Sequence, residues 1–162
     1  MQKILHNIAP VWDKDSRVLV LGSFPSPKSR ETAFFYGHPQ NRFWRVMSAI
    51  YNTGTPMTVK EKKQFLLENH IALWDVIASC DIVGSSDSSI KNVIPNDVQK
   101  ILDIAPIEKI FVNGKKAEQL YKKYIEKEIG RVAIVLPSTS PANAAWSVEK
   151  LINEWGREIK GR

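Results

Sequence analysis

The chain has 162 residues, of which 43% are hydrophobic and 25% charged; this length and composition predict one globular domain over residues 1–162. Its formal net charge of +6 favours a polyanionic partner, because neutralised phosphates release counterions. A single cysteine, Cys80, excludes an internal disulfide and a cluster of thiolate metal ligands. The N-terminus lacks the apolar block of a signal peptide and no apolar run is long enough to cross a membrane, so we expect a cytoplasmic protein that does not bind membranes.

Strand and helix patterns alternate along the chain. In chain order they predict a strand over residues 17–21, helices over 41–51 and 58–69, a strand over 71–76, a helix capped by Asn96 or Asp97, a strand over 109–112, a helix over 117–124, a strand over 132–136 and a helix over 148–159. Apolar strands separated by helices are typical of a parallel sheet that is covered on both faces. We therefore predict a three-layer α/β/α sandwich with a central four-stranded parallel sheet.

Three loops rich in Gly, Pro, Ser and Asn follow the first, third and fourth predicted strands. They are residues 22–26, 113–114 and 137–143. In such sheets, ligands bind outside the carboxyl ends of the strands. The sequence therefore predicts that these loops meet at one rim.

A further polar segment runs from Tyr36 to Trp44 and supplies an aromatic ring, an amide and an arginine at the mouth of a helix. The Gly/Pro turn at residues 22–25 allows a ligand to approach the backbone closely. A close backbone approach, a stacking ring and a fixed amide together suit a nucleobase that has been flipped out of a duplex.

Three motifs together resemble the uracil-DNA glycosylase superfamily, and within it the hypoxanthine-DNA glycosylase branch, which is related to the mismatch-specific uracil-DNA glycosylases. The motifs are residues 22–26 (GSFPS), 37–44 (GHPQNRFW) and 136–143 (LPSTSPAN). The resemblance implies a monofunctional DNA glycosylase of base excision repair. Such an enzyme flips a deaminated base, here hypoxanthine before xanthine or uracil, and hydrolyses its N-glycosidic bond to leave an abasic site. We expect a monomer that acts on DNA containing deaminated bases, without a cofactor or metal.

The first motif departs from the better-known branches at Phe24. Related enzymes carry an asparagine or aspartate there to hold the attacking water, and a phenylalanine side chain cannot do so. By its place in the motif, the candidate catalytic amide is Asn41, which could orient a water or the base. An asparagine just before Arg-Phe-Trp is equally suited to cap a helix. Asp75 is the second candidate for positioning the water; its alternative is to accept backbone donors at the strand end.

The predicted base-binding residues are of two kinds. Tyr36 is expected to stack on the base, and Asn113 to recognise it, because a fixed amide complements the N1–H and O6 of hypoxanthine. An Asn-Gly turn is the alternative for Asn113. The remaining contacts would come from the turn and the loop glycine: Gly22, Ser23, Phe24, Pro25 and Gly37.

The predicted DNA-binding residues carry hydroxyls, amides or positive charge near the rim. Their alternatives are helix capping by Asn143, an ion pair of Arg42 with a carboxylate, and loop stabilisation by His38. The set is Ser26, His38, Arg42, Ser138, Thr139, Ser140, Pro141, Ala142 and Asn143. Two other functions stay open: a non-catalytic lesion-binding protein and a small-nucleoside hydrolase or binder.

Overall fold

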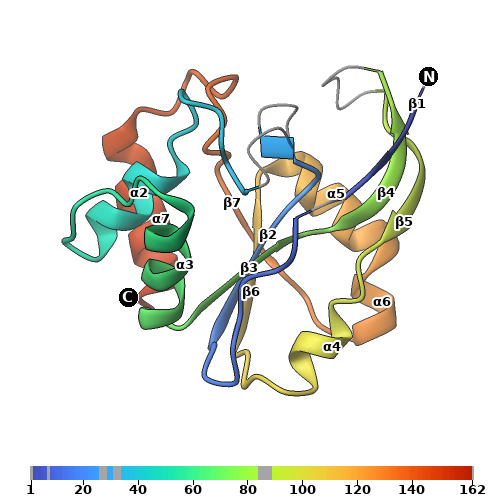
Figure 1. Ribbon diagram of the computed structural model, residues 1–162, viewed down its shortest axis with the longest axis horizontal. Helices are drawn as coiled ribbons and strands as arrows, with labels where there is room; N and C mark the ends of the chain where they lie inside the picture. The colour runs from blue at the N-terminus through green and yellow to red at the C-terminus, as the bar shows by residue number, and fades with distance from the viewer. Residues whose placement is uncertain (1, 7, 26–28, 31–33, 84–88, 162) are drawn as a thin grey trace.

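The computed structural model describes residues 2–6, 8–25, 29–30, 34–83 and 89–161. At its centre lies a four-stranded parallel sheet with the strand order β3-β2-β6-β7 (Figure 1). The strands are β2 (Val18–Gly22), β3 (Ile71–Asp75), β6 (Lys109–Asn113) and β7 (Ile134–Leu136). The prediction of four parallel strands is confirmed.

Helices cover both faces of this sheet. Figure 1 shows α2 (Phe43–Ile50), α3 (Val59–Glu68) and α7 (Val148–Ile159) on one side, and α4 (Gln99–Leu102), α5 (Lys115–Tyr124) and α6 (Glu126–Ile129) on the other. The predicted apolar stripe of α7 is buried through Leu151, Trp155 and Ile159. The three-layer α/β/α sandwich is therefore confirmed. None of the helices in the described part of the chain has the length and apolar character that crossing a membrane requires.

A second, antiparallel sheet was not predicted. It has the order β1-β4-β5 and consists of β1 (Gln2–Leu5), β4 (Ile77–Ile82) and β5 (Lys91–Pro95). Only Val76 separates β3 from β4, so the strand predicted over residues 71–76 ends where the chain passes from one sheet into the other. Because β1 pairs with β4, the segment after β1 is brought beside the end of β3.

The junction of the two sheets is fixed by Asn96, which sequence reasoning had considered as a helix cap. α4 begins later, after Val98, and has no side-chain cap. The amide of Asn96 instead donates to the carbonyl oxygens of Asp75 (2.9 Å) and Ile77 (3.2 Å). The capping expectation for this helix is therefore wrong, and Asn96 stabilises the exit of β3.

Candidate active site

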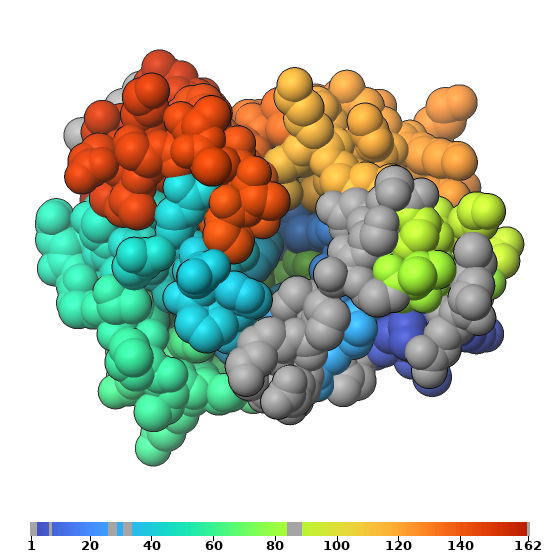
Figure 2. Space-filling model, turned by 90° about the horizontal axis from the view of Figure 1, so that it is seen from above, coloured from blue at the N-terminus to red at the C-terminus, as the bar shows by residue number. Residues whose placement is uncertain are grey.

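A cavity of about 810 Å³ opens at the carboxyl edge of the parallel sheet. Figure 2 looks down into it, between the orange loop before α7, the cyan segment before α2 and the yellow-orange start of α5. Its size lies within the range of ordinary ligand pockets. Most of the predicted site residues line it: Gly22, Ser23, Phe24, Pro25, Tyr36, His38, Asn41, Asn113, Ser138, Thr139, Ser140, Pro141, Ala142 and Asn143.

Three predicted site residues are not among those that line the cavity. Ser26 lies outside the described residues. The N–H of Gly37 donates to the hydroxyl of Ser29 at 2.8 Å, which anchors the loop before α2. Arg42 is buried, with 9% of its surface exposed.

The Arg42 guanidinium binds the inner side of the loop before α7. Its Nε donates to the carbonyl of Thr139 (3.3 Å), and Nη2 donates to those of Ser140 (2.8 Å) and Asn143 (3.1 Å). Nη1 donates to the carbonyl of Trp146. The structure therefore places Arg42 differently from both expectations, because it bonds to backbone carbonyls rather than lying at the rim for a phosphate or pairing with a carboxylate.

Thr139 connects the two predicted amides. Its hydroxyl accepts from Asn113 Nδ2 (3.1 Å) and donates to Asn41 Oδ1 (2.9 Å), while its backbone N–H donates to Asn113 Oδ1 (3.1 Å). The residue is 0% exposed. Thr139 was predicted to contact DNA, and the structure places it behind the surface as the link between Asn113 and Asn41.

The orientation of the Asn41 amide follows from its partners. Its Oδ1 accepts from the backbone N–H of Phe43 at 2.9 Å as well as from Thr139. A backbone N–H can only donate, so the amide atom that faces it is oxygen. The N-cap residue of α2 is Arg42, and the helix has no side-chain cap, so the expectation that Asn41 caps it is wrong, although Asn41 bonds to its first residue. With both acceptor positions of Oδ1 in use, Asn41 has only its NH₂ group to offer a ligand in the cavity.

The two serine hydroxyls of the loop before α7 bond within the loop. Ser138 Oγ accepts from the N–H of Ser140, and Ser140 Oγ accepts from the N–H of Ala142. Asn143 donates to the carbonyl of Ser138 at 3.0 Å. The cap of α7 is Ser147, so the capping alternative for Asn143 is wrong.

His38 and Pro141 lie at the exposed mouth of the cavity. The Nδ1 of His38 accepts from the N–H of Gln40 at 3.1 Å, which is the loop-stabilising contact considered for it. Contact of either residue with DNA stays a prediction.

Tyr36 has an unusual backbone for an aromatic residue. Its φ of 53° lies in the left-handed region, where non-glycine residues are uncommon and strain is often found at functional sites. One face of its ring stacks on Phe43, with centroids 4.3 Å apart and an interplanar angle of 22°. Burial, and then the neighbouring Asp75 carboxylate, raise the pKa of the Tyr36 phenol well above its ordinary value. The hydroxyl therefore remains protonated at physiological pH.

The floor of the cavity lies under Gly22, at the end of β2. A Cβ at this position would lie 2.9 Å from the Tyr36 hydroxyl and still closer to Asp75 Oδ1. Only glycine leaves room for both groups. Phe24 lies beside this floor and packs edge-on against His6, with ring centroids 6.0 Å apart. Phe24 thus contributes packing at the wall of the cavity.

The charged side chains around the cavity are mainly positive. Arg30, Lys115 and Lys116 line it, and among the described lining residues Asp75 carries the one carboxylate. The Arg30 guanidinium donates to the carbonyl of Pro25 and lies 5.6 Å from the centre of the Phe24 ring. In the described part of the chain, no group of three or more His, Cys, Asp or Glu side chains is placed to hold a metal ion. This lining suits an anionic ligand.

Comparison with known proteins assigns the family. The model of the "Uracil DNA glycosylase superfamily" matches residues 9–158. The chain belongs to the uracil DNA glycosylase superfamily. It is 35% identical over 147 residues to a protein of Methanosarcina acetivorans named hypoxanthine DNA glycosylase. The matched residues are 90% of this chain and 91% of that one.

Two further relatives agree with the superfamily assignment. A protein of Methanosarcina barkeri, also named hypoxanthine DNA glycosylase, is 31% identical over 153 residues, which are 93% of this chain and 95% of the relative. A solution NMR structure of a protein provisionally assigned as a uracil DNA glycosylase, from M. acetivorans, superposes with a TM-score of 0.80 at 32% identity. It covers 94% of this chain and 95% of that one. The resemblance stated from the three motifs is confirmed.

Sequence reasoning missed two features of this superfamily member. His6 was assigned no role, although its Nε2 lies 2.9 Å from Asp75 Oδ2. It lies 69 residues from Asp75 in the chain, and only the pairing of β1 with β4 brings the two together. The role of Thr139 in linking Asn41 to Asn113 was also missed. Its one signal in the sequence was its place in the loop, between residues that were predicted to face the ligand.

Proposed function

We propose that this protein is a monofunctional DNA glycosylase of base excision repair that excises deaminated bases, hypoxanthine first, and leaves an abasic site. Membership of the uracil DNA glycosylase superfamily supports the reaction class. The names of the two Methanosarcina relatives support hypoxanthine as the base. The observation that carries the catalytic part is the Asn41 amide, held in one orientation at the cavity.

The fixed amide suits the departing base. Hydrolysis of an N-glycosidic bond builds positive charge on the sugar and negative charge on the base, and a preorganised donor lowers the barrier by stabilising that charge. Asn41 Oδ1 already accepts two hydrogen bonds, so its NH₂ group is the end that meets the substrate. We assign Asn41 the stabilisation of the leaving base rather than the activation of water.

Stacking would hold the base during the reaction. The Tyr36 ring rests on Phe43 on one side, which fixes its plane while Tyr36 lines the cavity. A base stacked on an aromatic side chain gains about 1–3 kcal/mol. Ser23, Phe24 and Pro25 would close the cavity around the base from the β2 side.

The substrate would be DNA rather than a free nucleoside. The net charge of +6 and the positions of Arg30, Lys115 and Lys116 at the cavity favour a polyanion. The exposed residues Pro141 and Ala142 project from a loop that Arg42 holds from behind, and this loop would meet the backbone of the flipped nucleotide. We propose a monomer acting in the cytoplasm.

The test is a panel of single-lesion oligonucleotides containing hypoxanthine, xanthine or uracil, in duplex and single strands, at enzyme excess. We expect alkali-labile sites in hypoxanthine duplexes and no strand cleavage without alkali. Their absence at enzyme excess would refute the glycosylase. Binding without product would instead favour a lesion-binding protein, and hydrolysis of free inosine with inert DNA would favour a nucleoside hydrolase.

Two substitutions at Asn41 separate the structural contacts of Oδ1 from catalysis by the NH₂ group. Asn41→Asp keeps the oxygen that accepts from Phe43 and Thr139 but removes the NH₂ group, whereas Asn41→Ala removes both. We expect both variants to lose about 10²-fold or more in turnover. Only Asn41→Ala should also lose the two hydrogen bonds of Oδ1, which contribute about 1–3 kcal/mol of unfolding free energy. Full turnover in Asn41→Asp would remove Asn41 from the catalytic role.

A further inference from the structure

Two lysine ammonium groups of α3 lie over a pair of stacked aromatic rings. Lys62 Nζ is 5.3 Å from the centre of the Trp44 ring, and Lys63 Nζ is 6.0 Å from the centre of the Phe34 ring. The two rings stack on each other, with centroids 6.0 Å apart and an interplanar angle of 19°, and both are buried. Lys62 and Lys63, the lysine pair, therefore bring two positive charges together over one aromatic pair.

The glutamates of α3 do not balance these charges. Glu61 Oε1 accepts from two backbone N–H groups at the start of the helix, both at 3.0 Å, and Glu68 accepts from Gln64 at 2.7 Å. Among the described residues, no carboxylate forms an ion pair with Lys62 or Lys63. Both acids of the helix are thus engaged elsewhere, and the positive charge of the lysine pair remains available.

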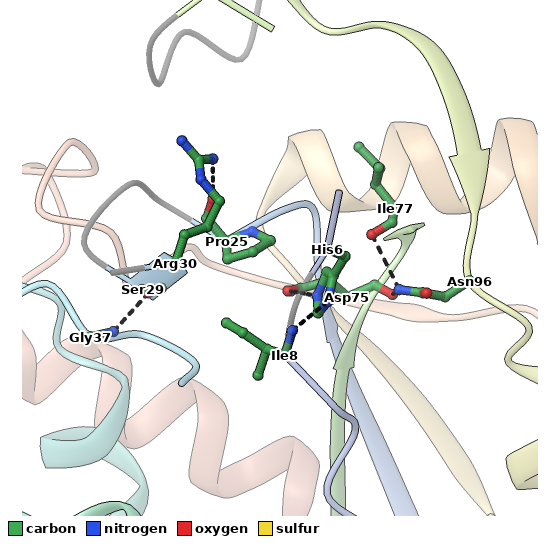
Figure 3. A network of polar contacts seen from close by, with 9 residues as sticks. All are labelled: His6, Ile8, Pro25, Ser29, Arg30, Gly37, Asp75, Ile77 and Asn96. Atoms are coloured by element: carbon green, nitrogen blue, oxygen red, sulfur yellow. Dashed lines mark hydrogen bonds and ion pairs between the residues drawn. The ribbon is translucent and has the colours of Figure 1, made fainter. Parts of the chain in front are cut away.

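Two other cations near the cavity are engaged by the protein itself. Arg30 donates to the carbonyl of Pro25 (Figure 3), and Arg42 donates to the carbonyls of the loop before α7. The lysine pair has ring faces instead, which attract a cation but do not cancel its charge. Burial lowers the pKa of the Lys62 amine, because the charged form loses water without gaining an opposite charge. A bound anion would supply that opposite charge.

The lysine pair lies beside the cavity and not in it. α3 leads directly into β3, so its first turns lie toward the carboxyl edge of the sheet, where the cavity opens (Figure 1). The rings beneath the lysines back the cavity wall, because Trp44 Nε1 donates to the carbonyl of Phe35 at 3.1 Å and Phe35 lines the cavity. Neither lysine is among the lining residues.

We propose that Lys62 and Lys63 bind a backbone phosphate of the DNA on one flank of the lesion, outside the cavity that receives the base; the proposal rests on the glycosylase function given above. An ammonium carries three donors, so each lysine can face its ring and still donate to a phosphate. Two neighbouring ammonium groups match the two charged oxygens of a phosphodiester.

Positive charge on the other side of the cavity supports this path for the DNA. Lys115 and Lys116, at the start of α5, line the cavity, and α5 covers the face of the sheet opposite α3 (Figure 1). A strand that crosses the mouth with one nucleotide turned inward would meet the lysine pair on one flank and α5 on the other. Phosphates are the same at every position, so the lysine pair contributes affinity and register rather than base preference.

Neutralising the lysine pair tests the site. For Lys62→Gln/Lys63→Gln, fluorescence anisotropy on a hypoxanthine duplex should give about tenfold weaker binding at low salt. The slope of log K against log[salt] should shrink by about 0.9 per lost contact. The single-turnover rate at saturating enzyme should stay near that of the wild type, because no reacting group is touched. Lys62→Arg/Lys63→Arg keeps the charge over the rings and should restore both affinity and slope.

A matched control separates this site from general charge loss. Lys100 and Lys160 each lie 5.0 Å from the centre of one ring and do not line the cavity. Lys100→Gln/Lys160→Gln therefore removes the same charge and the same kind of contact, and its affinity should change far less. If this control loses as much affinity as Lys62→Gln/Lys63→Gln, the proposal is wrong.

Duplexes shortened on one side locate the contact. Two duplexes are compared, each ending one base pair from the lesion, one on its 5′ side and the other on its 3′ side. The affinity loss of Lys62→Gln/Lys63→Gln should vanish on one of them and persist on the other. A loss that persists on both would overturn the proposal. If the wild type releases no hypoxanthine while its binding still depends on the lysine pair, the glycosylase function fails and the phosphate site stands.

Discussion

Replacing Thr139 with valine removes one hydroxyl and leaves the side-chain volume nearly unchanged. The hydroxyl accepts from Asn113 and donates to Asn41, and the residue is fully buried. Each hydrogen bond contributes about 0.5–1.5 kcal/mol net to stability, so losing both lowers the free energy of unfolding by about 1–3 kcal/mol. For a protein of this size, 1 kcal/mol corresponds to about 2–4 °C in Tm. Thr139→Val should therefore melt about 2–12 °C below the wild type.

The same substitution should also lower the rate of base excision. Without the hydroxyl, Asn41 Oδ1 retains only the N–H of Phe43, and the amide is free to turn about it. We expect turnover on hypoxanthine DNA to fall about 10²-fold, the scale for one lost transition-state donor. Single-turnover assays at enzyme excess, with urea unfolding on the same preparations, measure both effects.

Thr139→Ser is the matched control. It keeps the hydroxyl and removes a buried methyl group, which costs about 1 kcal/mol. Both variants are thus destabilised, but only Thr139→Val lacks the link between the amides. If Thr139→Val is destabilised and yet excises hypoxanthine at the wild-type rate, the link does not orient Asn41 and the reasoning fails.

Two other substitutions have expected outcomes. Gly22→Ala should lower the free energy of unfolding by about 1–3 kcal/mol and remove most of the activity, because the new methyl group would overlap Asp75 Oδ1 and the Tyr36 hydroxyl. Gly54→Ala is the control. Nothing lies within 4 Å of its added carbon, so it should be neutral in both urea unfolding and excision assays. Arg42→Lys should lose about 2–4 kcal/mol in urea unfolding, because an ammonium cannot reproduce the guanidinium's contacts with the loop carbonyls. A stable Arg42→Lys variant with weaker, less salt-dependent DNA binding would instead restore the phosphate role.

The predictable part of the fold is the part whose signal is local. Residues 17–21 and 109–112 are continuous apolar runs, and such runs indicate buried parallel strands whatever surrounds them. Ligands of such sheets bind at the carboxyl ends of the strands, and this rule correctly predicts that Asn113 and the loop before α7 line one cavity. The antiparallel sheet had no such signal, because β5 is short and mostly exposed and β4 follows β3 after a single residue.

The roles of single side chains were less predictable than their location. Asn41 and Tyr36 do line the cavity, but their chemical use depends on which of their atoms already have partners. For Asn41 the partner is Thr139, 98 residues away, and for Asp75 it is His6, 69 residues away. Contacts at such separations follow from the pairing of the sheets and leave no local pattern. Arg42 was misplaced for the same reason, since its acceptors lie about a hundred residues further along the chain.

The buried guanidinium of Arg42 also changes what the outside of its loop presents to an approaching polyanion. Each carbonyl turned toward Arg42 directs the negative end of a peptide dipole inward, where a full positive charge neutralises it. Those oxygens therefore face away from the surface that would contact nucleic acid, and they do not repel its phosphates. A cation that never touches the strand can in this way lower the electrostatic cost of bringing the strand close.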